Sequence, residues 1–171
     1  MSETPSDHDI EATVRAAAAR LSPLARVLDC DPALADTAEF CAAYGYTAAE
    51  SVNTILVVGK SDPPVFAACL VRADSRLDVN GAVRRRLGVK KASFASPDDT
   101  VRLTGMMIGG VTPLALPADL PVWIDAAVAD NELVIVGGGS RSIKVHLPPT
   151  SLLELPGAEF VEGLAKPLDP A

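Results

Sequence analysis

Two short, mostly apolar runs near the middle of the chain restrict its fold more than any other feature. They span residues 54–58 and 65–71, and Gly59 and Pro63-Pro64 lie between them. Runs of this length and composition predict two strands joined by a tight connection. Because the runs do not alternate with polar residues, we expect the strands to lie in a sheet that is covered on both faces.

The remaining predicted elements mix helices and strands without a regular alternation. Helical spacing or capping residues predict helices at Ile10 to Leu21, from about Asp36 or Thr37 to Gly45, at 78–87, and from Ser96-Pro97 to Gly105. Further strands are predicted at 122–124, 133–136 and 143–147, and a last helix at about 151–155. This order indicates an α+β fold with a mixed sheet flanked by helices. His8 is placed in a polar tail before the first helix.

Length and composition favour one domain with a proper core. The chain has 171 residues, of which 49% are hydrophobic, and this predicts a single domain over 1–171 with a helical N-terminal extension. No apolar run approaches the roughly 20 residues of a membrane-spanning helix, and the first residues are polar and acidic. We therefore expect a cytoplasmic protein with no membrane partner. Cys30, Cys41 and Cys69 show no C-x-x-C spacing and are interpreted as reduced core residues.

The net charge of −7 argues against a protein that binds nucleic acid by bulk electrostatics. We expect no DNA partner, and any contact with nucleic acid must be local. The candidate residues for such a contact are Arg84, Arg85, Arg86, Lys90 and Lys91. Three consecutive arginines point in different directions around a helix, so a solvated surface is the alternative interpretation.

The usual catalytic and metal-binding patterns do not occur in the sequence. His8 and His146 are not at metal-ligand spacing, and no nucleophile elbow, P-loop or dinucleotide fingerprint is found. Two glycine-rich segments, 104–113 and 137–142, are the remaining candidates. Their backbone N–H groups could point together at a developing oxyanion, or both segments could be ordinary turns.

The first glycine-rich segment resembles a family signature. The run T-G-x-x-x-G-G-V-T-P at 104–113 is similar to the T-G-x-x-x-G-G-x-x-P pattern of the YbaK/ProX family, which includes the editing domain of bacterial prolyl-tRNA synthetases. Three further segments, 77–88, 90–97 and 136–141, agree in order and spacing. The resemblance covers roughly residues 40–155.

This resemblance implies a mixed, partly barrel-like sheet whose cleft receives the 3′ end of an aminoacyl-tRNA. The family hydrolyses the ester of a wrongly attached amino acid, without a metal or organic cofactor, and a pocket of defined size acts as a second sieve. A synthetase is a further candidate partner. The substrate-binding candidates are Thr54, Thr104, Met106, Gly109, Gly110, Pro113, Gly137, Gly138, Gly139 and Arg141.

Two positions differ from the family pattern. The family lysine precedes the threonine of a strand, and here Asn53 occupies that position. A residue that is often acidic in the strand after the second glycine-rich turn is Lys144 in this chain. We therefore hypothesise that Lys144 replaces the missing charge, and we name Lys144, Asn53 and Gly105 as catalytic candidates. The alternative is that Lys144 points outward on its strand and is solvated.

Three functions stay open from the sequence. The first is a trans-acting deacylase of mischarged tRNA, in which oriented backbone amides and a positioned water would suffice because aminoacyl esters are already reactive. The second is a catalytically silent module that binds tRNA ends or a synthetase, which Asn53 favours. A structural partner protein is the third.

Overall fold

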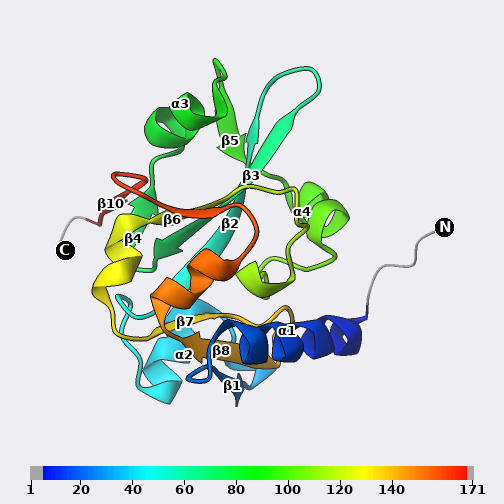
Figure 1. Cartoon of the computed structure of the whole chain (residues 1–171), viewed down its shortest axis with the longest axis vertical. Coiled ribbons are helices and arrows are strands. Elements are labelled where there is room, and N and C mark those ends of the chain that lie inside the picture. The colour runs from blue at the N-terminus through cyan, green and yellow to red at the C-terminus, as the bar shows by residue number, and fades with distance from the viewer. Residues whose placement is uncertain (1–5, 169–171) are drawn as a thin grey trace.

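The computed structural model describes residues 6–168 and contains four α-helices and ten strands within that range (Figure 1). The helices are α1 Asp7–Leu21, α2 Thr37–Tyr44, α3 Arg84–Leu87 and α4 Pro97–Thr104. The strands are β1 Arg26–Asp29, β2 Val52–Gly59, β3 Val65–Arg72, β4 Ser75–Leu77, β5 Ala92–Phe94, β6 Val122–Asp125, β7 Val134–Gly137, β8 Ile143–Leu147, β9 Ala158–Val161 and β10 Ala165–Pro167.

The strands form three sheets. The largest has the order β5-β2-β3-β6-β9, in which β2 is antiparallel to β3 and β5, and β6 is parallel to β3 and β9. The second is the antiparallel sheet β1-β8-β7, and the third pairs β10 with β4. The predicted α+β fold with a mixed sheet is confirmed, and the described strands do not close into a barrel.

The central strands are buried on both faces, as their apolar runs predicted. On β3, Ala68 and Leu70 belong to one core cluster, while Ala67, Cys69 and Val71 belong to the cluster on the opposite face. Both clusters are continuous with residues of the surrounding helices and loops. Covering both faces explains why neither strand alternates between apolar and polar residues.

The smaller sheet β1-β8-β7 is also covered on both faces. Ile143, Val145 and Leu147 of β8 point into the main core. Lys144 and His146 alternate to the other face, where Phe40 of α2 lies against Lys144 and Tyr46 lies against His146. This second layer decides the environment of Lys144.

Helix ends follow the capping residues in the sequence. Ser96 accepts a hydrogen bond from the Asp99 N–H at the start of α4, and Gly45 ends α2 in the left-handed conformation. The predicted helix at 78–87 is a π-helix, Val79–Val83, that continues into α3. The predicted tail position of His8 is wrong, because His8 lies in the first turn of α1.

Five strands were not predicted: β1, β4, β5, β9 and β10. Each has only three or four residues and most contain charged side chains, so none has a clear period-two pattern. Two of the cysteines, Cys30 and Cys69, are buried as expected, but Cys41 on α2 is partly exposed, so its assignment to the core is wrong. None of the helices within 6–168 is long and apolar enough to cross a membrane.

The two glycine-rich segments pack directly against each other. The Gly139 N–H donates to the Gly110 carbonyl at 2.8 Å. A Cβ atom added to Gly137 would lie 2.3 Å from the carbonyl oxygen of Val111. The backbones of the two segments are therefore in direct contact at Gly137, where a side chain would clash.

We predict that Gly137→Ala lowers the melting temperature by about 5 °C, because overpacking typically costs about 1–3 kcal/mol and 1 kcal/mol corresponds to about 2–4 °C in a chain of this size. Gly163→Ala is the control, since no atom lies within 4 Å of the added Cβ and only backbone strain at its φ of +70° is introduced. Thermal unfolding followed by circular dichroism measures both. Equal shifts for the two variants would mean that the close packing of the two segments does not limit stability.

Candidate functional site

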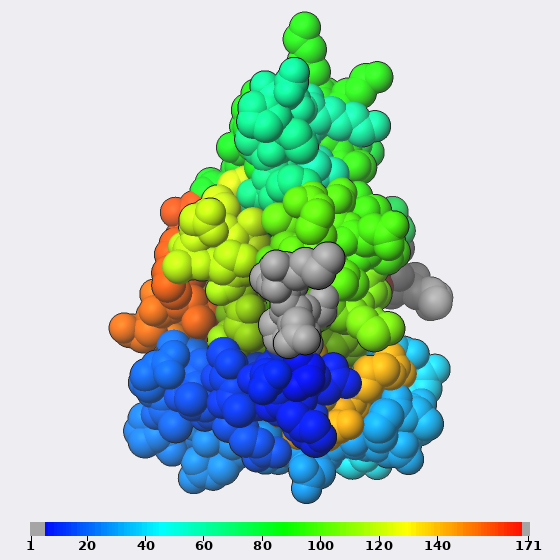
Figure 2. Space-filling view, turned by 90° about the vertical axis from the view of Figure 1, so that its right-hand side faces the viewer, coloured from blue at the N-terminus to red at the C-terminus, as the bar shows by residue number. Residues whose placement is uncertain are grey.

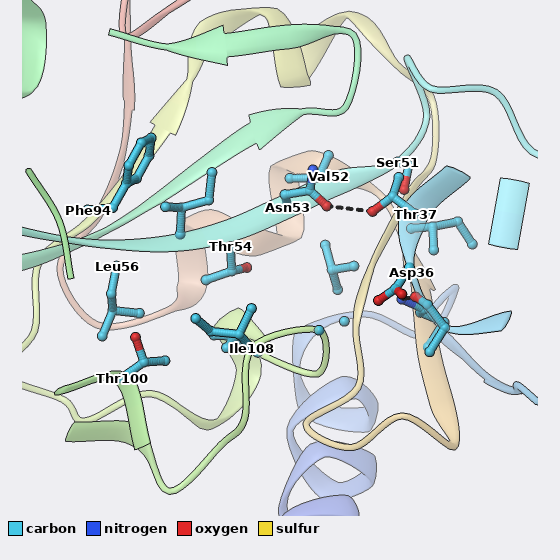
Figure 3. A pocket seen from close by; sticks show the side chains of 18 of the residues that line it. Asp36, Thr37, Ser51, Val52, Asn53, Thr54, Leu56, Phe94, Thr100 and Ile108 are labelled. Atoms are coloured by element: carbon cyan, nitrogen blue, oxygen red, sulfur yellow. Dashed lines mark hydrogen bonds between the residues drawn. The ribbon is translucent and has the colours of Figure 1, made fainter. Parts of the chain in front are cut away.

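A cavity of about 390 Å³ lies between β2, the first glycine-rich segment and the start of α2 (Figure 3). One wall consists of Ser51 and the first five residues of β2, Val52 to Leu56, and α4 contributes Thr100. The other lining residues are Ala35, Asp36, Thr37, Phe94, Ala95, Ile108, Gly109, Val111, Ile135, Val136, Gly137 and Lys144. The cavity thus joins segments that are far apart in the sequence.

Lys144 is the buried cation of this cavity. Its residue is 8% exposed, its Nζ donates to the Ala35 carbonyl at 2.8 Å, and Nζ lies 5.2 Å from the centre of the Phe40 ring. Burial is the main cause that lowers the pKa of the Lys144 ammonium below its ordinary value of 10.5, and the nearby Arg141 acts in the same direction. The alternative of an outward, solvated Lys144 is wrong, because α2 covers that face of β8.

Asn53 lies at the same cavity and is oriented by a side chain of α2. Its Oδ1 accepts a hydrogen bond from Thr37 Oγ1 at 2.9 Å (Figure 3). With the amide oxygen occupied in this way, the amide NH₂ group of Asn53 is the donor that it can offer to a ligand. Asn53 and Lys144 therefore line one cavity from two different sheets.

Arg141 connects the start of α2 to the glycine-rich segment. Its guanidinium donates to Asp36 Oδ1 at 2.9 Å and to the Pro32 carbonyl at 3.0 Å. The hydrogen bond from Arg141 is the main cause that lowers the pKa of the Asp36 carboxyl. At Gly109, whose φ is +97°, an added Cβ would lie 2.7 Å from Arg141 Nη1. Arg141 thus packs against the loop from outside the cavity.

The structure brings five of the predicted site residues to the cavity wall: Asn53, Thr54, Gly109, Gly137 and Lys144. Thr104 and Gly105 end α4, where Thr104 Oγ1 accepts from the Met106 N–H. Met106 is buried in the core. Gly110, Pro113, Gly138 and Gly139 lie behind the wall, where the two glycine-rich segments pack or the next short helix begins.

The basic candidates lie at the end of the molecule opposite α1, where α3, β5 and the β2–β3 turn form a narrow tip (Figures 1 and 2). Arg84 donates to the Asn80 carbonyl, and Arg86 pairs with Glu159 and lies over the Trp123 ring. Arg85, Lys90 and Lys91 are exposed.

Sequence reasoning missed the contribution of α2 to the site. Asp36 and Thr37 were recognised only as a helix start, yet both line the cavity. Asp36 makes no side-chain capping bond to its own helix, which leaves its carboxylate for Arg141. No local signal predicts that pair, because the two residues are 105 positions apart in the chain.

The arrangement can stabilise negative charge and orient a polar ligand. It combines one buried ammonium, one oriented amide and a glycine backbone around a partly apolar cavity. Such groups suit a reaction in which an oxyanion develops, since charge stabilisation is strongest where water is excluded. Within residues 6–168, no three His, Cys, Asp or Glu side chains gather in a way that could hold a metal ion.

Comparisons with known proteins agree on one family. The family model described as "Aminoacyl-tRNA editing domain" matches residues 31–155. The chain is 26% identical over 110 residues to EbsC of Enterococcus faecalis, named as a candidate Cys-tRNA(Pro)/Cys-tRNA(Cys) deacylase, and 35% identical over 81 residues to YwhH of Bacillus subtilis. These matches cover 64% and 47% of this chain, and 65% and 50% of the relatives, so each spans less than two thirds of the relative.

Solved structures show the same fold. One, described as a candidate trans-editing enzyme for prolyl-tRNA synthetase, superposes with a TM-score of 0.78 at 25% identity and covers 92% of this chain and 96% of its own. A second, of a hypothetical protein, has a TM-score of 0.79 at 26% identity and covers 90% and 99% of the two chains.

We predict that Lys144→Met raises the melting temperature at pH 7, because burying the ammonium opposes folding. Since the pKa of Lys144 is lower in the folded state than the ordinary 10.5, the unfolded chain holds this proton to higher pH than the folded chain does. Wild-type stability therefore gains on the variant as the pH rises towards 10.5, and the difference between the two melting temperatures shrinks. Lys166→Met, at an exposed lysine on β10, is the control. A difference that stays constant or grows with pH contradicts the burial effect.

Proposed function

The chain belongs to the aminoacyl-tRNA editing domain family, and on this premise we propose that it hydrolyses the ester bond of mischarged aminoacyl-tRNA in trans, in the cytoplasm. The observation that carries the proposal is the shared cavity of Lys144, Asn53 and Gly109. It supplies a cation, an amide donor and glycine backbone at one place. An aminoacyl-tRNA synthetase is a further candidate partner.

The proposed reaction needs no protein nucleophile. Water, or water assisted by the neighbouring ribose hydroxyl, adds to the ester carbonyl carbon, and the carbonyl oxygen gains negative charge. Lys144 stabilises that charge, and the bond from carbon to the ribose oxygen then breaks, with a proton passing to the ribose oxygen. The products are the free amino acid and the tRNA. The protein's contribution is orientation and charge stabilisation.

In this proposal, Lys144 takes the role of the lysine that the family resemblance implies at position 53. A lysine ammonium is a point charge on a flexible stem, so it can reach the same oxygen from another wall of a cavity. Burial keeps this charge out of bulk water. The charge therefore acts more strongly on a reacting group than it would in water. Asn53 then serves as a neutral donor in the same cavity.

A catalytically silent tRNA-binding module is the second candidate. Asn53 favours it, because the position held by the family lysine carries no charge here. In that case the protein binds mischarged and correctly charged tRNA without accelerating the release of the amino acid. Turnover is the measurement that distinguishes the two functions.

We predict that the purified protein releases amino acid from at least one mischarged tRNA without added metal. The panel should include tRNA(Pro) charged with cysteine, alanine and serine, since EbsC is named for cysteine on tRNA(Pro) and the cavity has room for a small side chain. Radiolabelled amino acid release is compared with the spontaneous rate. If no member of the full panel releases amino acid above that rate, the deacylase function is rejected and the binding module is favoured.

On the best substrate, Lys144→Met should lower the rate by about two orders of magnitude, the scale of losing one oxyanion donor. Asn53→Ala should cost less because a neutral donor is lost. Lys166→Met removes an exposed lysine and should leave the rate unchanged. If Lys144→Met retains the full rate, its charge has no part in the reaction.

We predict that the exposed basic residues at the tip bind tRNA phosphates. Replacing Arg85, Lys90 and Lys91 with glutamine should reduce the slope of log affinity against log salt by about 2 to 3, close to one unit per lost phosphate contact. Arg86 is kept, because it pairs with Glu159 and packs on Trp123. The control replaces Arg15, Arg20 and Arg26, which lie at the α1 and β1 end of the molecule (Figure 1). If both triple variants show the same slope of log affinity against log salt, the tip is an ordinary solvated surface.

A further inference from the structure

Strand β2 has an interrupted edge at the cavity. On the side that faces β5, the Leu56 carbonyl accepts from the Ala95 N–H and the Lys60 N–H donates to the Lys91 carbonyl, each at 2.9 Å. Because backbone groups repeat their direction every second residue, the N–H and C=O of Thr54 face this same edge. After β5, the chain turns away from β2 at Ser96 and begins α4. Pairing with β5 therefore does not extend to Thr54.

On the other side of the gap, β7 pairs with the residue that precedes β2, through a single bridge between Ser51 and Ile135. The bridge does not extend into a ladder towards Thr54. Ile135, Val136 and Gly137 of β7 instead line the cavity. Thr54 therefore occupies the part of β2 between its two partners on this edge, and its backbone faces the cavity.

The Thr54 side chain supplies a second, independent sign of a polar ligand. Its Oγ1 atom is buried and has no hydrogen-bond partner, and it is the one such side-chain atom within residues 6–168. Buried polar groups are nearly always paired, and an exception calls for an explanation such as a site for a ligand. In the close-up, Thr54 projects from β2 into the space bounded by Ile108, Leu56 and Thr100 (Figure 3).

We propose that Thr54 is the subsite that binds the aminoacyl group, as if the amino acid were one residue of an added strand. This inference rests on the proposed function and names how the substrate is held. An α-aminoacyl group carries an N–H donor and a C=O acceptor at the spacing of one residue of a protein chain. In an antiparallel hydrogen-bonded pair, one residue exchanges both bonds with the residue opposite. The Thr54 N–H then donates to the acyl carbonyl, and the Thr54 carbonyl accepts from the α-amino group.

The surroundings of Thr54 fit this pose. Lys144 and Gly109 line the same cavity, so a carbonyl held at Thr54 lies within the site where charge is stabilised. Leu56 and Ile108 offer an apolar surface for the side chain of the amino acid. The Thr54 hydroxyl adds a third polar contact. The ligand class is an ester or amide of an α-amino acid with a free amino group, attached to a ribose.

The direct test follows the Thr54 backbone amide by nuclear magnetic resonance. The ligand is 3′-deoxy-3′-(L-alanylamino)adenosine, whose amide bond replaces the labile ester. We expect its binding to slow hydrogen exchange of the Thr54 amide at least about tenfold by forming a new hydrogen bond. The Val58 amide, which lies in the β2–β5 ladder, should change little. Unchanged exchange at Thr54 with saturating ligand, or no binding at millimolar concentration, overturns the subsite.

Side-chain variants test the hydroxyl separately. Thr54→Val keeps the shape and the backbone but removes the unpaired oxygen, so the melting temperature should rise by roughly 2–4 °C. Its deacylation rate should fall about tenfold, and Thr54→Ser, which keeps a hydroxyl, should lose less. A Thr54→Val variant with the full rate overturns the hydroxyl contact. If the wild type hydrolyses no substrate but the analogue still protects the Thr54 amide, the proposed function fails and the subsite stands.

Discussion

The interruption of pairing along one edge of β2 is the constraint on which the rest of the site depends. β5 pairs with β2 only at Val57 to Gly59, and β7 pairs with this edge only at Ser51, the residue before β2. A continuous ladder there would fill the space that the cavity occupies. Two features keep the gap open. After β5 the chain begins α4 at Ser96-Pro97, and proline cannot continue the ladder. The two glycine-rich segments pack against each other behind the cavity wall.

The buried charge of Lys144 is the second consequence of the layered fold. Alternation along β8 places Lys144 on the face opposite Val145, and α2 covers that face. Burying this ammonium is unfavourable, and its hydrogen bond to one carbonyl and its contact with one aromatic ring compensate only part of the lost hydration. Such a residue is better explained by a task than by stability, because a hydrophobic side chain would suit the position at least as well.

Much of the fold was predictable because its signals are local. The apolar runs gave the central strands, and the Ser96-Pro97 pair gave the start of α4. The short strands β1, β5 and β9 were not predictable, since they depend on pairing with distant partners rather than on their own composition. In the site, Asn53, Thr54, Gly109, Gly137 and Lys144 were named from the family resemblance and meet at one cavity. Asp36 and Thr37 were missed, because the contacts of α2 with β2, β8 and Arg141 are long-range.

The proposed reaction requires one positive charge in the cavity, and this charge can stand on either wall. The most direct test measures the deacylation rate of the double variant Asn53→Lys with Lys144→Met, which places the charge where the family resemblance implies it. We predict that this variant recovers about tenfold of the roughly hundredfold rate lost in Lys144→Met alone. A double variant that stays as slow as Lys144→Met, while folded and able to bind tRNA, would contradict the account.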